Sequence, residues 1–409
     1  MTICIGCVAC WMRYKTGDGM KIVADQNILA LESWFSHQAD LVLLPGREIT
    51  RKDLHDADAL LVRSITRVDR KLLDNTPVKF VGTATSGTDH LDLNWLAQAG
   101  IQVADAAGAN ASAVAEYVLA VLAVLIREHE FLPWQKTVAV VGVGHVGSAL
   151  IKRLRALGIQ CVGCDPFNKS VAGLDYVSLE DALQADVVCL HTPLSTDGEF
   201  ATRHMLDAKR LATMRPDVVL INAGRGEVID SQALLSHAME QPDAKIILDV
   251  WENEPSPLPA LVKKINVGTP HIAGYSVEAK LAASRRVLSA LCESFSLDMP
   301  TTLPPPDLPL LVHDERYQTI SGSEIQPGSG SDEQVFADVL LRAFSPRKLS
   351  DRFSTKYLKG KSDNGARVFD KVRKELIGRR EYSASHVLAS AVSPQVASWL
   401  HASGFVLQA

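Results

Sequence analysis

The stretch TVAVVGVGHVGSALIKRLRALG, at residues 137–158, constrains the fold of this chain more than any other stretch. Branched apolar residues, typical of a buried strand, lead into three glycines, and an amphipathic helical pattern follows. In a strand, turn and helix of this kind, Gly142 makes the turn and Gly147 lets the helix pack closely on the strand, while Gly144 leaves room for a ligand beside the backbone. The stretch therefore predicts a βαβ unit whose first turn binds a dinucleotide.

The residues around this turn indicate which dinucleotide it binds. A pyrophosphate would lie at the helix N-terminus near His145 and Val146, where unpaired N–H groups and the helix dipole favour an anion. The next predicted strand ends in Asp165, eighteen positions after Gly147, where a carboxylate can bind the ribose hydroxyls and repel an extra 2′-phosphate. No arginine directly follows Asp165. We therefore predict NAD rather than NADP, bound by the three glycines, His145, Val146 and Asp165.

Short apolar runs alternate with helical stretches in two separate parts of the chain. Between residues 20 and 109 the apolar runs are KIVA, LVLLP, ALLVRS, KFVGTATSG and IQVADA. Between residues 136 and 271 they are TVAVVGV, QCVGCDP, DVVCLHTP, VVLINAG, KIILDVW and INVGTPHI. This alternation is typical of parallel sheets covered on both faces by helices, so the predicted fold class is α/β. Residues 111–132 are small or apolar nearly all round, which predicts a long buried helix.

Composition argues against several classes of protein. The chain has 409 residues, enough for two or three domains, and no apolar run reaches the ~18 residues that a membrane span needs. Its formal net charge of -5 gives no general attraction to nucleic acid. Cys4, Cys7 and Cys10 are spaced like metal ligands, but no second cluster follows to complete a tetrahedral site, so we predict no metal. Residues 1–19 show neither strand nor helix periodicity nor a secretory signal, and we interpret them as a non-core extension of a cytoplasmic protein.

Three polar residues just past predicted strands of the second series fit the oxidation of a hydroxy acid. Arg225 in INAGRGEVID offers a planar fork for a substrate carboxylate. His271 in GTPHIAGYS can exchange a proton near neutral pH, and Glu254 in DVWENEP could orient its imidazole. Glu252 and Asp249 compete with Glu254 for that position, and Asp249 could instead contact the nicotinamide side of the cofactor. Ligands of open α/β sheets bind beyond the carboxyl ends of the strands, which is where these residues fall.

The motifs VGVGHVG, HTPL, NAGRG, DVWENEP and PHIAGYS, in this order and spacing, resemble the D-2-hydroxyacid dehydrogenase family. The resemblance implies that Arg225 anchors the substrate carboxylate, that His271 is the acid/base, and that Glu254 is the partner of the histidine. It also implies that NAD is lined by Thr192, Asp249 and Gly274. The fold expected from the resemblance has two Rossmann-like, doubly wound parallel-sheet domains around a cleft.

The expected domains follow the two series and a change of composition after Met299. We expect a substrate domain at residues 20–110, completed by residues 272–298, and an NAD-binding domain at residues 111–271. The following stretch, TTLPPPDLPLLV, has the composition of a proline-rich linker. The resemblance implies that residues 299–409 contain this linker and a smaller α+β domain that mediates homodimerisation.

Four further stretches, ALLVRSITRV, KFVGTATSGTDHLD, AAGANASAVAEYV and GTPHIAGYSVEAK, resemble the branch of the family that oxidises a phosphorylated four-carbon 2-hydroxy acid. On this resemblance, Ser64, Thr85 and Tyr275 bind the substrate. Hydroxyl donors, with Arg63 beside Ser64, suit a polyhydroxylated and phosphorylated acid. Contacts to its phosphate from the C-terminal part of the chain are hypotheses for Arg347, Arg352, Arg379 and Arg380.

Two alternatives share these motifs. Another dehydrogenase of the family, acting on 3-phosphoglycerate or a glyoxylate-type acid, would keep every catalytic residue and differ in the loops of the first domain and in the C-terminal part. An NAD-sensing interaction protein on the same fold, such as a transcriptional corepressor, would turn over slowly and use its C-terminal part to bind partners.

Overall fold

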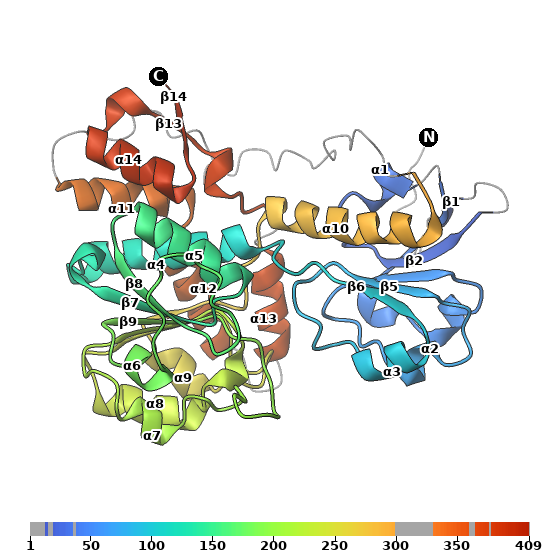
Figure 1. The fold of residues 1–409 in the computed structure, drawn as a ribbon, viewed down its shortest axis with the longest axis horizontal. Coiled ribbons are helices and arrows are strands. Elements are labelled where there is room, and N and C mark those ends of the chain that lie inside the picture. Colours follow the sequence, from blue (N-terminus) through green and yellow to red (C-terminus); the bar gives the residue numbers. More distant parts are fainter. Residues whose placement is uncertain are drawn as a thin grey trace. The chain divides into compact units, whose positions relative to one another are not determined.

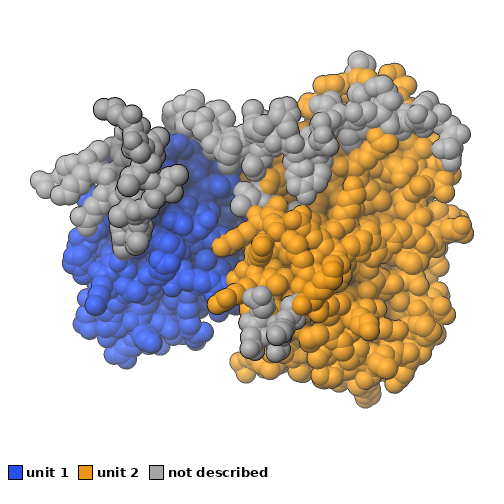
Figure 2. Space-filling model, turned by 180° about the vertical axis from the view of Figure 1, so that it is seen from behind, with its two compact units in different colours: residues 1–110, 278–311 blue, residues 111–277, 312–409 orange. Residues whose placement is uncertain are grey.

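The computed structural model describes residues 13–14, 19–35, 38–298, 330–359, 365–375 and 378–408. The chain forms two compact units, coloured blue and orange in Figure 2. Unit 1 comprises Met1–Asn110 and Glu278–Leu311, and unit 2 comprises Ala111–Val277 and Val312–Ala409. The cysteines considered as metal ligands, Cys4, Cys7 and Cys10, lie outside the described residues.

Unit 1 is built on a six-stranded sheet with the strand order β1-β3-β2-β4-β5-β6 (Figure 1). Every neighbouring pair is parallel except β1 and β3. The strands are β1 (Arg13–Tyr14), β2 (Lys21–Asp25), β3 (Asp40–Leu44), β4 (Ala59–Val62), β5 (Phe80–Thr83) and β6 (Gln102–Ala104). The predicted α/β fold is confirmed, and the five parallel strands fall on the five apolar runs of the first series.

The sequence does not predict strand β1. Arg13 pairs with Val42 and Tyr14 with Leu41 at the edge of the sheet. An edge strand is held by backbone hydrogen bonds along one side, so it needs no apolar periodicity of its own. Part of the expected extension at residues 1–19 therefore belongs to the sheet.

Helices cover both faces of the sheet of unit 1. Successive strand side chains point to opposite faces, so Ile22 and Leu61 lie in one core while Val23 and Leu60 lie in the other. The first core includes side chains of α1 and α10, and the second includes side chains of α2 and α3. These helices are α1 (Leu31–Phe35), α2 (Arg70–Leu73), α3 (Leu93–Gln98) and α10 (Val277–Phe295). Helix α10 follows the first segment of unit 2 in the sequence and completes unit 1.

Unit 2 has a six-stranded, fully parallel sheet with the strand order β12-β11-β10-β9-β7-β8 (Figure 1). The strands are β7 (Thr137–Val141), β8 (Gln160–Cys164), β9 (Val187–Leu190), β10 (Val219–Asn222), β11 (Lys245–Leu248) and β12 (Val267–Gly268). Alternate residues again enter separate cores, with Val138 and Val140 on one face and Ala139 and Val141 on the other. The strands fall on the six apolar runs of the second series.

Helices α4 and α5 cover one face of this sheet, and four shorter helices cover the other (Figure 1). Helix α4 is buried at every position from Ala113 to Ile126, as its apolar sequence predicts. The helices are α4 (Ala111–His129), α5 (His145–Ala156), α6 (Leu179–Ala182), α7 (Ala208–Leu211), α8 (Ser231–Glu240) and α9 (Pro259–Lys264). Within the described ranges, no helix combines the length and the apolar character that crossing a membrane requires.

The described C-terminal residues pack onto both faces of unit 2. Phe336, Leu340 and Leu400 belong to the same core cluster as the side chains of α4 and α5, whereas Phe353 and Phe369 belong to the core on the opposite face of the sheet. Strands β13 and β14 form a separate, parallel two-stranded sheet. The elements are α11 (Asp332–Ala343), α12 (Pro346–Lys359), α13 (Gly365–Lys374), β13 (His386–Leu388), α14 (Pro394–Ser403) and β14 (Val406–Gln408). This segment therefore shares its cores with the parallel sheet.

Candidate active site

Each of the three glycines after β7 is favoured at its position for a different structural reason. Gly142 has a φ of +89°, in the left-handed region that favours glycine, and a Cβ there would lie 2.8 Å from the backbone N of Thr192. A Cβ on Gly147 would lie 2.1 Å from the carbonyl oxygen of Gly142, so the helix could not pack as it does. Gly144, the N-cap residue of α5, would meet nothing within 4 Å. The space beside Gly144 is therefore open, which suits the approach of a pyrophosphate.

Asp165 lies against the same turn. Its Oδ2 accepts a hydrogen bond of 2.8 Å from the backbone N–H of Val143, and its Oδ1 accepts bonds from Phe167 and Asn168. His145 and Val146 are the first two residues of α5, where helical N–H groups have no partner within the helix. The carboxylate is thus fixed at the end of β8, and its contact with a ribose stays a prediction.

Two buried side chains after β9 leave polar atoms unsatisfied. Thr192 is 8 % exposed, and its Oγ1 has no hydrogen-bond partner among the described residues. Both ring nitrogens of His191 are likewise buried without a partner, and burial lowers the pKa of His191 to about 4. Buried polar atoms normally have partners, so an orphan hydroxyl beside the glycine turn fits a bound ligand. The sequence places Thr192 at the cofactor but gives no signal for His191 beyond its place in the HTPL motif.

The structure brings two of the three predicted catalytic residues together. His271 Nδ1 and Glu254 Oε2 lie 2.8 Å apart, and Glu254 Oε1 accepts a 2.8 Å bond from the backbone N–H of Trp251. Burial alone would raise the pKa of the Glu254 carboxyl, but His271 and these donors outweigh it, and the net pKa is lowered. The carboxylate form of Glu254 accepts the Nδ1 proton, which leaves Nε2 as the ring nitrogen able to exchange a proton with a substrate.

Glu252, a competitor of Glu254 in the sequence, belongs to a different pair. Its Oε1 lies 2.7 Å from His204 Nε2, and its Oε2 accepts a 3.0 Å bond from the N–H of Ser231. The pKa of Glu252 is raised by burial but lowered more by these partners, so the net shift is downward. The described part of unit 2 therefore contains two histidine–glutamate pairs, and Glu254 is the carboxylate that contacts His271.

Asp249 supports the loop that carries His271. It is 1 % exposed, its Oδ1 accepts bonds from Thr269 Oγ1 at 2.6 Å and the Ile272 N–H at 2.8 Å, and its Oδ2 accepts from the Ala273 N–H at 2.8 Å. Burial raises the pKa of Asp249 despite these donors. His271 itself has a φ of +54°, a strained conformation for a residue with a side chain. We infer that these bonds hold the strained loop, while a contact of Asp249 with NAD stays a prediction.

A buried arginine from the C-terminal segment holds the same loop. Arg379 is 1 % exposed and donates from Nη1 to the carbonyl of Ala273 at 2.6 Å and from Nη2 to that of Ala113 at 2.7 Å. Its guanidinium carbon lies 3.9 Å from the ring centroid of Phe344. Both Nη groups of Arg379 are thus used to hold the loop, and its Nε is buried without a hydrogen-bond partner among the described residues. Arg379 therefore has a structural role, and a contact with the phosphate stays a hypothesis.

Arg225 follows β10 in the same way as His271 follows β12. Asn222 Nδ2 donates a 2.9 Å bond to the Arg225 carbonyl, and Arg225 Nη1 donates to the Gly224 carbonyl at 2.9 Å. Strands β9, β10, β11 and β12 are neighbours in a parallel sheet, so residues just after them share one edge. These residues are Thr192, Arg225, Asp249 and His271.

The predicted substrate residues divide between the units. In unit 1, Ser64 follows β4 and is exposed, and Thr85 Oγ1 lies 2.7 Å from Thr83 Oγ1 and donates to the Gly87 carbonyl at 3.0 Å. In unit 2, Gly274 and Tyr275 follow His271 on its loop, and Tyr275 Oη accepts a 2.9 Å bond from Arg373. Neither the periodicity of the sequence nor its motifs predict that Arg373 contacts Tyr275.

Two other arginines considered as phosphate ligands are paired within the fold. Arg347 Nε lies 2.9 Å from Glu128 Oε1, and Arg347 Nη1 donates to the Asn266 carbonyl at 2.6 Å. Arg352 Nη2 lies 2.8 Å from Glu375. Arg380 is exposed.

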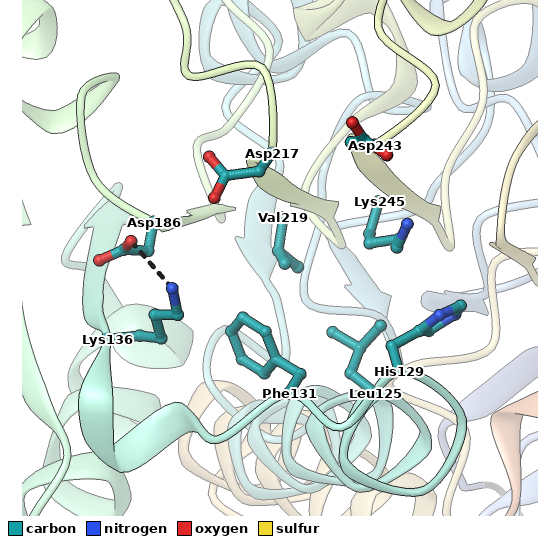
Figure 3. Close-up of a pocket in the computed structure, with 9 residues that line it drawn as sticks. All are labelled: Leu125, His129, Phe131, Lys136, Asp186, Asp217, Val219, Asp243 and Lys245. Atoms are coloured by element: carbon teal, nitrogen blue, oxygen red, sulfur yellow. Dashed lines mark ion pairs between the residues drawn. The ribbon is translucent and has the colours of Figure 1, made fainter.

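A pocket of about 170 Å³ lies at the opposite edge of the same sheet (Figure 3). Its lining includes Lys136, Asp186 and Lys245, which stand at the amino ends of β7, β9 and β11, and Lys136 forms an ion pair of 3.5 Å with Asp186. Because ligands of open α/β sheets bind beyond the carboxyl ends, this pocket is separate from the candidate active site.

The family comparison agrees with the geometry. Residues 127–273 match the family described as D-isomer specific 2-hydroxyacid dehydrogenase, NAD binding domain. A glyoxylate reductase from Paecilomyes thermophila shares the fold, with a TM-score of 0.58 and 24% identity over 69% of this chain and 98% of that chain. Fold and site thus define an NAD-dependent dehydrogenase of the 2-hydroxyacid class, and the predicted NAD cofactor is confirmed.

Relatives narrow this class. An erythronate-4-phosphate dehydrogenase from Marinobacter nauticus is 40% identical over 398 residues, covering 95% of this chain and 100% of the relative. Another from Chromohalobacter salexigens is 47% identical over 280 residues, covering 68% of this chain and 73% of the relative. The chain belongs to the family of erythronate-4-phosphate dehydrogenases.

Proposed function

We propose that this chain oxidises 4-phospho-D-erythronate to (3R)-3-hydroxy-2-oxo-4-phosphooxybutanoate, a step in pyridoxal 5′-phosphate (vitamin B6) synthesis. The observation that carries the chemistry is the His271–Glu254 pair, 2.8 Å apart, on the same sheet edge as the open glycine turn. The observation that carries the substrate is the similarity, over 95% of the chain, to a relative with this name. The enzyme acts on a CH–OH group.

The residues of the site divide the work of the reaction. Arg225 binds the substrate carboxylate, and His271 Nε2 accepts the proton of the C2 hydroxyl as the C2–O bond becomes a carbonyl. Glu254 stabilises the imidazolium that results. NAD, when bound, accepts the hydride from C2. Contacts from Ser64, Thr85 and Tyr275 to the rest of the substrate complete the proposal.

The cofactor residues in this proposal are those around the glycine turn and along the sheet edge. The open space at Gly144 receives the pyrophosphate, and Asp165 binds the ribose. The remaining proposed contacts come from Gly142, His145, Val146, Gly147, Thr192, Asp249 and Gly274.

The organisation of the protein in the cell is a further part of the proposal. We propose that residues 20–110 with 272–298 bind substrate, that residues 111–271 bind NAD, and that residues 299–409 mediate a homodimer. A phosphorylated substrate and NAD support a cytoplasmic location, and a net charge of -5 is consistent with no nucleic-acid or membrane partner. Sedimentation equilibrium of the full chain tests the dimer, which a monomer mass would contradict.

The test of the activity is NADH formation by purified protein with 4-phosphoerythronate or 3-phosphoglycerate. A 2-oxo acid is added in parallel, so that slow release of NADH does not hide turnover. We expect a strong preference for 4-phosphoerythronate. Activity with 3-phosphoglycerate alone would keep the catalytic residues but replace the substrate, and NAD binding without turnover of either acid would favour the sensing protein.

A further inference from the structure

Helix α13 of the C-terminal segment reaches the loop that carries the catalytic histidine. Arg373 Nη2 donates a 2.9 Å hydrogen bond to Tyr275 Oη, and the Arg373 guanidinium carbon lies 5.0 Å from the centroid of the Tyr275 ring. Tyr275 stands four residues after His271. The two residues of this contact are 98 positions apart in the chain, and both belong to unit 2. The C-terminal segment thus brings a positive charge next to a predicted substrate residue.

Arg373 differs from Arg352 and Lys356 in having no ion-pair partner among the described residues. Arg352 and Lys356, on the adjacent helix α12, both pair with Glu375, at 2.8 and 2.9 Å. Within the described ranges, Arg373 makes no ion pair, and its Nε is buried without a hydrogen-bond partner. A buried, unsatisfied donor is unfavourable, and a guanidinium has five N–H donors suited to an anion with several oxygens. No carboxylate of the described residues thus forms an ion pair with Arg373, and its Nε donor stays unsatisfied.

The charge of Arg373 also reaches the catalytic pair. It is among the groups that lower the pKa of Glu254, which shows that Arg373 lies within electrostatic range of that carboxylate. Glu254 already has His271 and the Trp251 N–H as its hydrogen-bond partners. Arg373 thus lies near the catalytic pair, while its hydrogen bond is made to Tyr275 and not to Glu254.

We propose that Arg373 binds the phosphate of the substrate, with Tyr275 beside it. This inference rests on the proposed function, which supplies an acid with a carboxylate at one end and a phosphate at the other. Arg225 takes the carboxylate beyond β10, and Arg373 takes the phosphate at the far side of the His271 loop. The C-terminal segment then determines specificity for a phosphorylated acid within its own subunit.

The test compares Arg373→Met with the parent enzyme. Methionine keeps an unbranched apolar stem against Tyr275 and Phe369 and removes the charge, since the Arg373 guanidinium also lies 5.9 Å from the Phe369 ring centroid. We expect KM for 4-phosphoerythronate to rise roughly 10- to 100-fold, the loss typical of a charged hydrogen bond. We also expect inorganic phosphate to inhibit the parent competitively against 4-phosphoerythronate, and to inhibit Arg373→Met at least about tenfold more weakly.

Two results would overturn the inference. One is an unchanged inhibition constant for phosphate in Arg373→Met, and the other is a parent that phosphate does not inhibit competitively. A fall in kcat with unchanged KM would equally contradict it, because it would make Arg373 a positioning residue for the loop rather than a phosphate ligand. If the parent fails to oxidise 4-phosphoerythronate at all, the proposed function fails instead.

Matched variants separate binding from folding. Arg352→Met removes a neighbouring guanidinium that is paired with Glu375, and we expect its KM and phosphate inhibition to match the parent. Arg373→Lys keeps the stem and the charge but loses the fork, so it should fold and show a KM between those of the parent and Arg373→Met. If Arg373→Met does not fold, an Arg373→Lys enzyme with parental KM and phosphate inhibition would overturn the proposal.

Discussion

The parallel strands of the two units follow the same order, but the space beyond the carboxyl end of the first parallel strand differs between the units. In each sheet, the first parallel strand of the unit lies between the second and the third, as β2 lies between β3 and β4 and β7 lies between β8 and β9. Open α/β sheets offer a binding crevice at this point, beyond the carboxyl ends of the strands. In unit 2 the space beside Gly144 is open.

Side chains fill the equivalent position of unit 1. Asp25, at the end of β2, is fully buried, and its Oδ2 accepts a 2.9 Å bond from Arg63 Nε while its Oδ1 accepts from Asn27. A Cβ on Gly46 would lie 2.4 Å from the same carboxylate. Strand order therefore provides the position, and the residues of the first loop decide whether it is a cofactor site or part of the core.

The largest effect should come from the chemistry at the open edge of unit 2. His271→Asn removes the proton acceptor, and we expect kcat to fall by roughly 10²- to 10⁴-fold, as for loss of a general base. Steady-state NADH formation measures it. His204→Asn removes the histidine of the other pair and should keep kcat within about twofold of the parent. A His271 variant as active as the parent would refute the assigned role.

Unit 1 should depend on its buried ion pair for stability. Asp25→Ala leaves Arg63 without its carboxylate, and we expect the free energy of unfolding of unit 1 to fall by about 3 kcal/mol in urea denaturation. Asp56→Ala removes an exposed carboxylate that pairs with Lys21 and should cost about 1 kcal/mol or less. NAD affinity should stay unchanged in both variants. Equal losses of stability in Asp25→Ala and Asp56→Ala would mean that the buried ion pair stabilises unit 1 no more than an exposed ion pair does.

Glycine substitutions test the open and filled positions directly. Gly144→Ala places a methyl group in open space, so we expect an unchanged Tm and an NAD dissociation constant raised roughly tenfold or more, because the methyl blocks the pyrophosphate. Gly46→Ala should do the reverse, with a lower Tm and unchanged NAD affinity. Calorimetry measures both quantities, and a lower Tm without weaker NAD binding in Gly144→Ala would contradict the assignment.

A further effect concerns pH and a buried carboxyl of α4. Burial raises the pKa of Glu116 to about 8, against the attraction of Arg379 and Arg153, so the folded protein retains a proton that the unfolded chain loses near pH 4.5. The stability contributed by Glu116 is therefore full below about pH 4.5 and is lost as pH rises to about 8. Glu116→Gln should lose less Tm than the parent between pH 5 and pH 8, while Glu130→Gln, at an exposed position, should follow the parent.

Local patterns made most of the fold predictable, because apolar runs and glycine spacing act over a few residues. The strands of both parallel series and the turn at Gly142 follow from such patterns. Strand β1 does not, since its pairing with β3 depends on backbone hydrogen bonds rather than on side-chain periodicity. The long apolar helix α4 was likewise predictable from composition alone.

The candidate site was predictable where motifs carry the residue types and unpredictable where packing sets the contacts. His271 and Glu254 are 17 positions apart and follow successive elements of the sheet, so their pairing could be expected. Residue chemistry alone left Glu252 and Glu254 in competition, because the partner of Glu252 is 48 positions away, and only the family resemblance of the motifs selected Glu254. The contact of Arg373 with Tyr275 depends on where α13 docks, which no local pattern records.

The anchoring of the His271 loop by Arg379 has a consequence for the order of synthesis. The carbonyl of Ala273 and the guanidinium that binds it are 106 positions apart, so the ribosome makes the loop well before its anchor. At about 5–20 residues per second, the delay is roughly 5 to 20 s. During that interval the nascent chain already contains every residue of the dinucleotide turn and the acid/base pair, yet the strained loop lacks the donor that closes it. The loop that carries His271 thus gains its Arg379 anchor only late in translation.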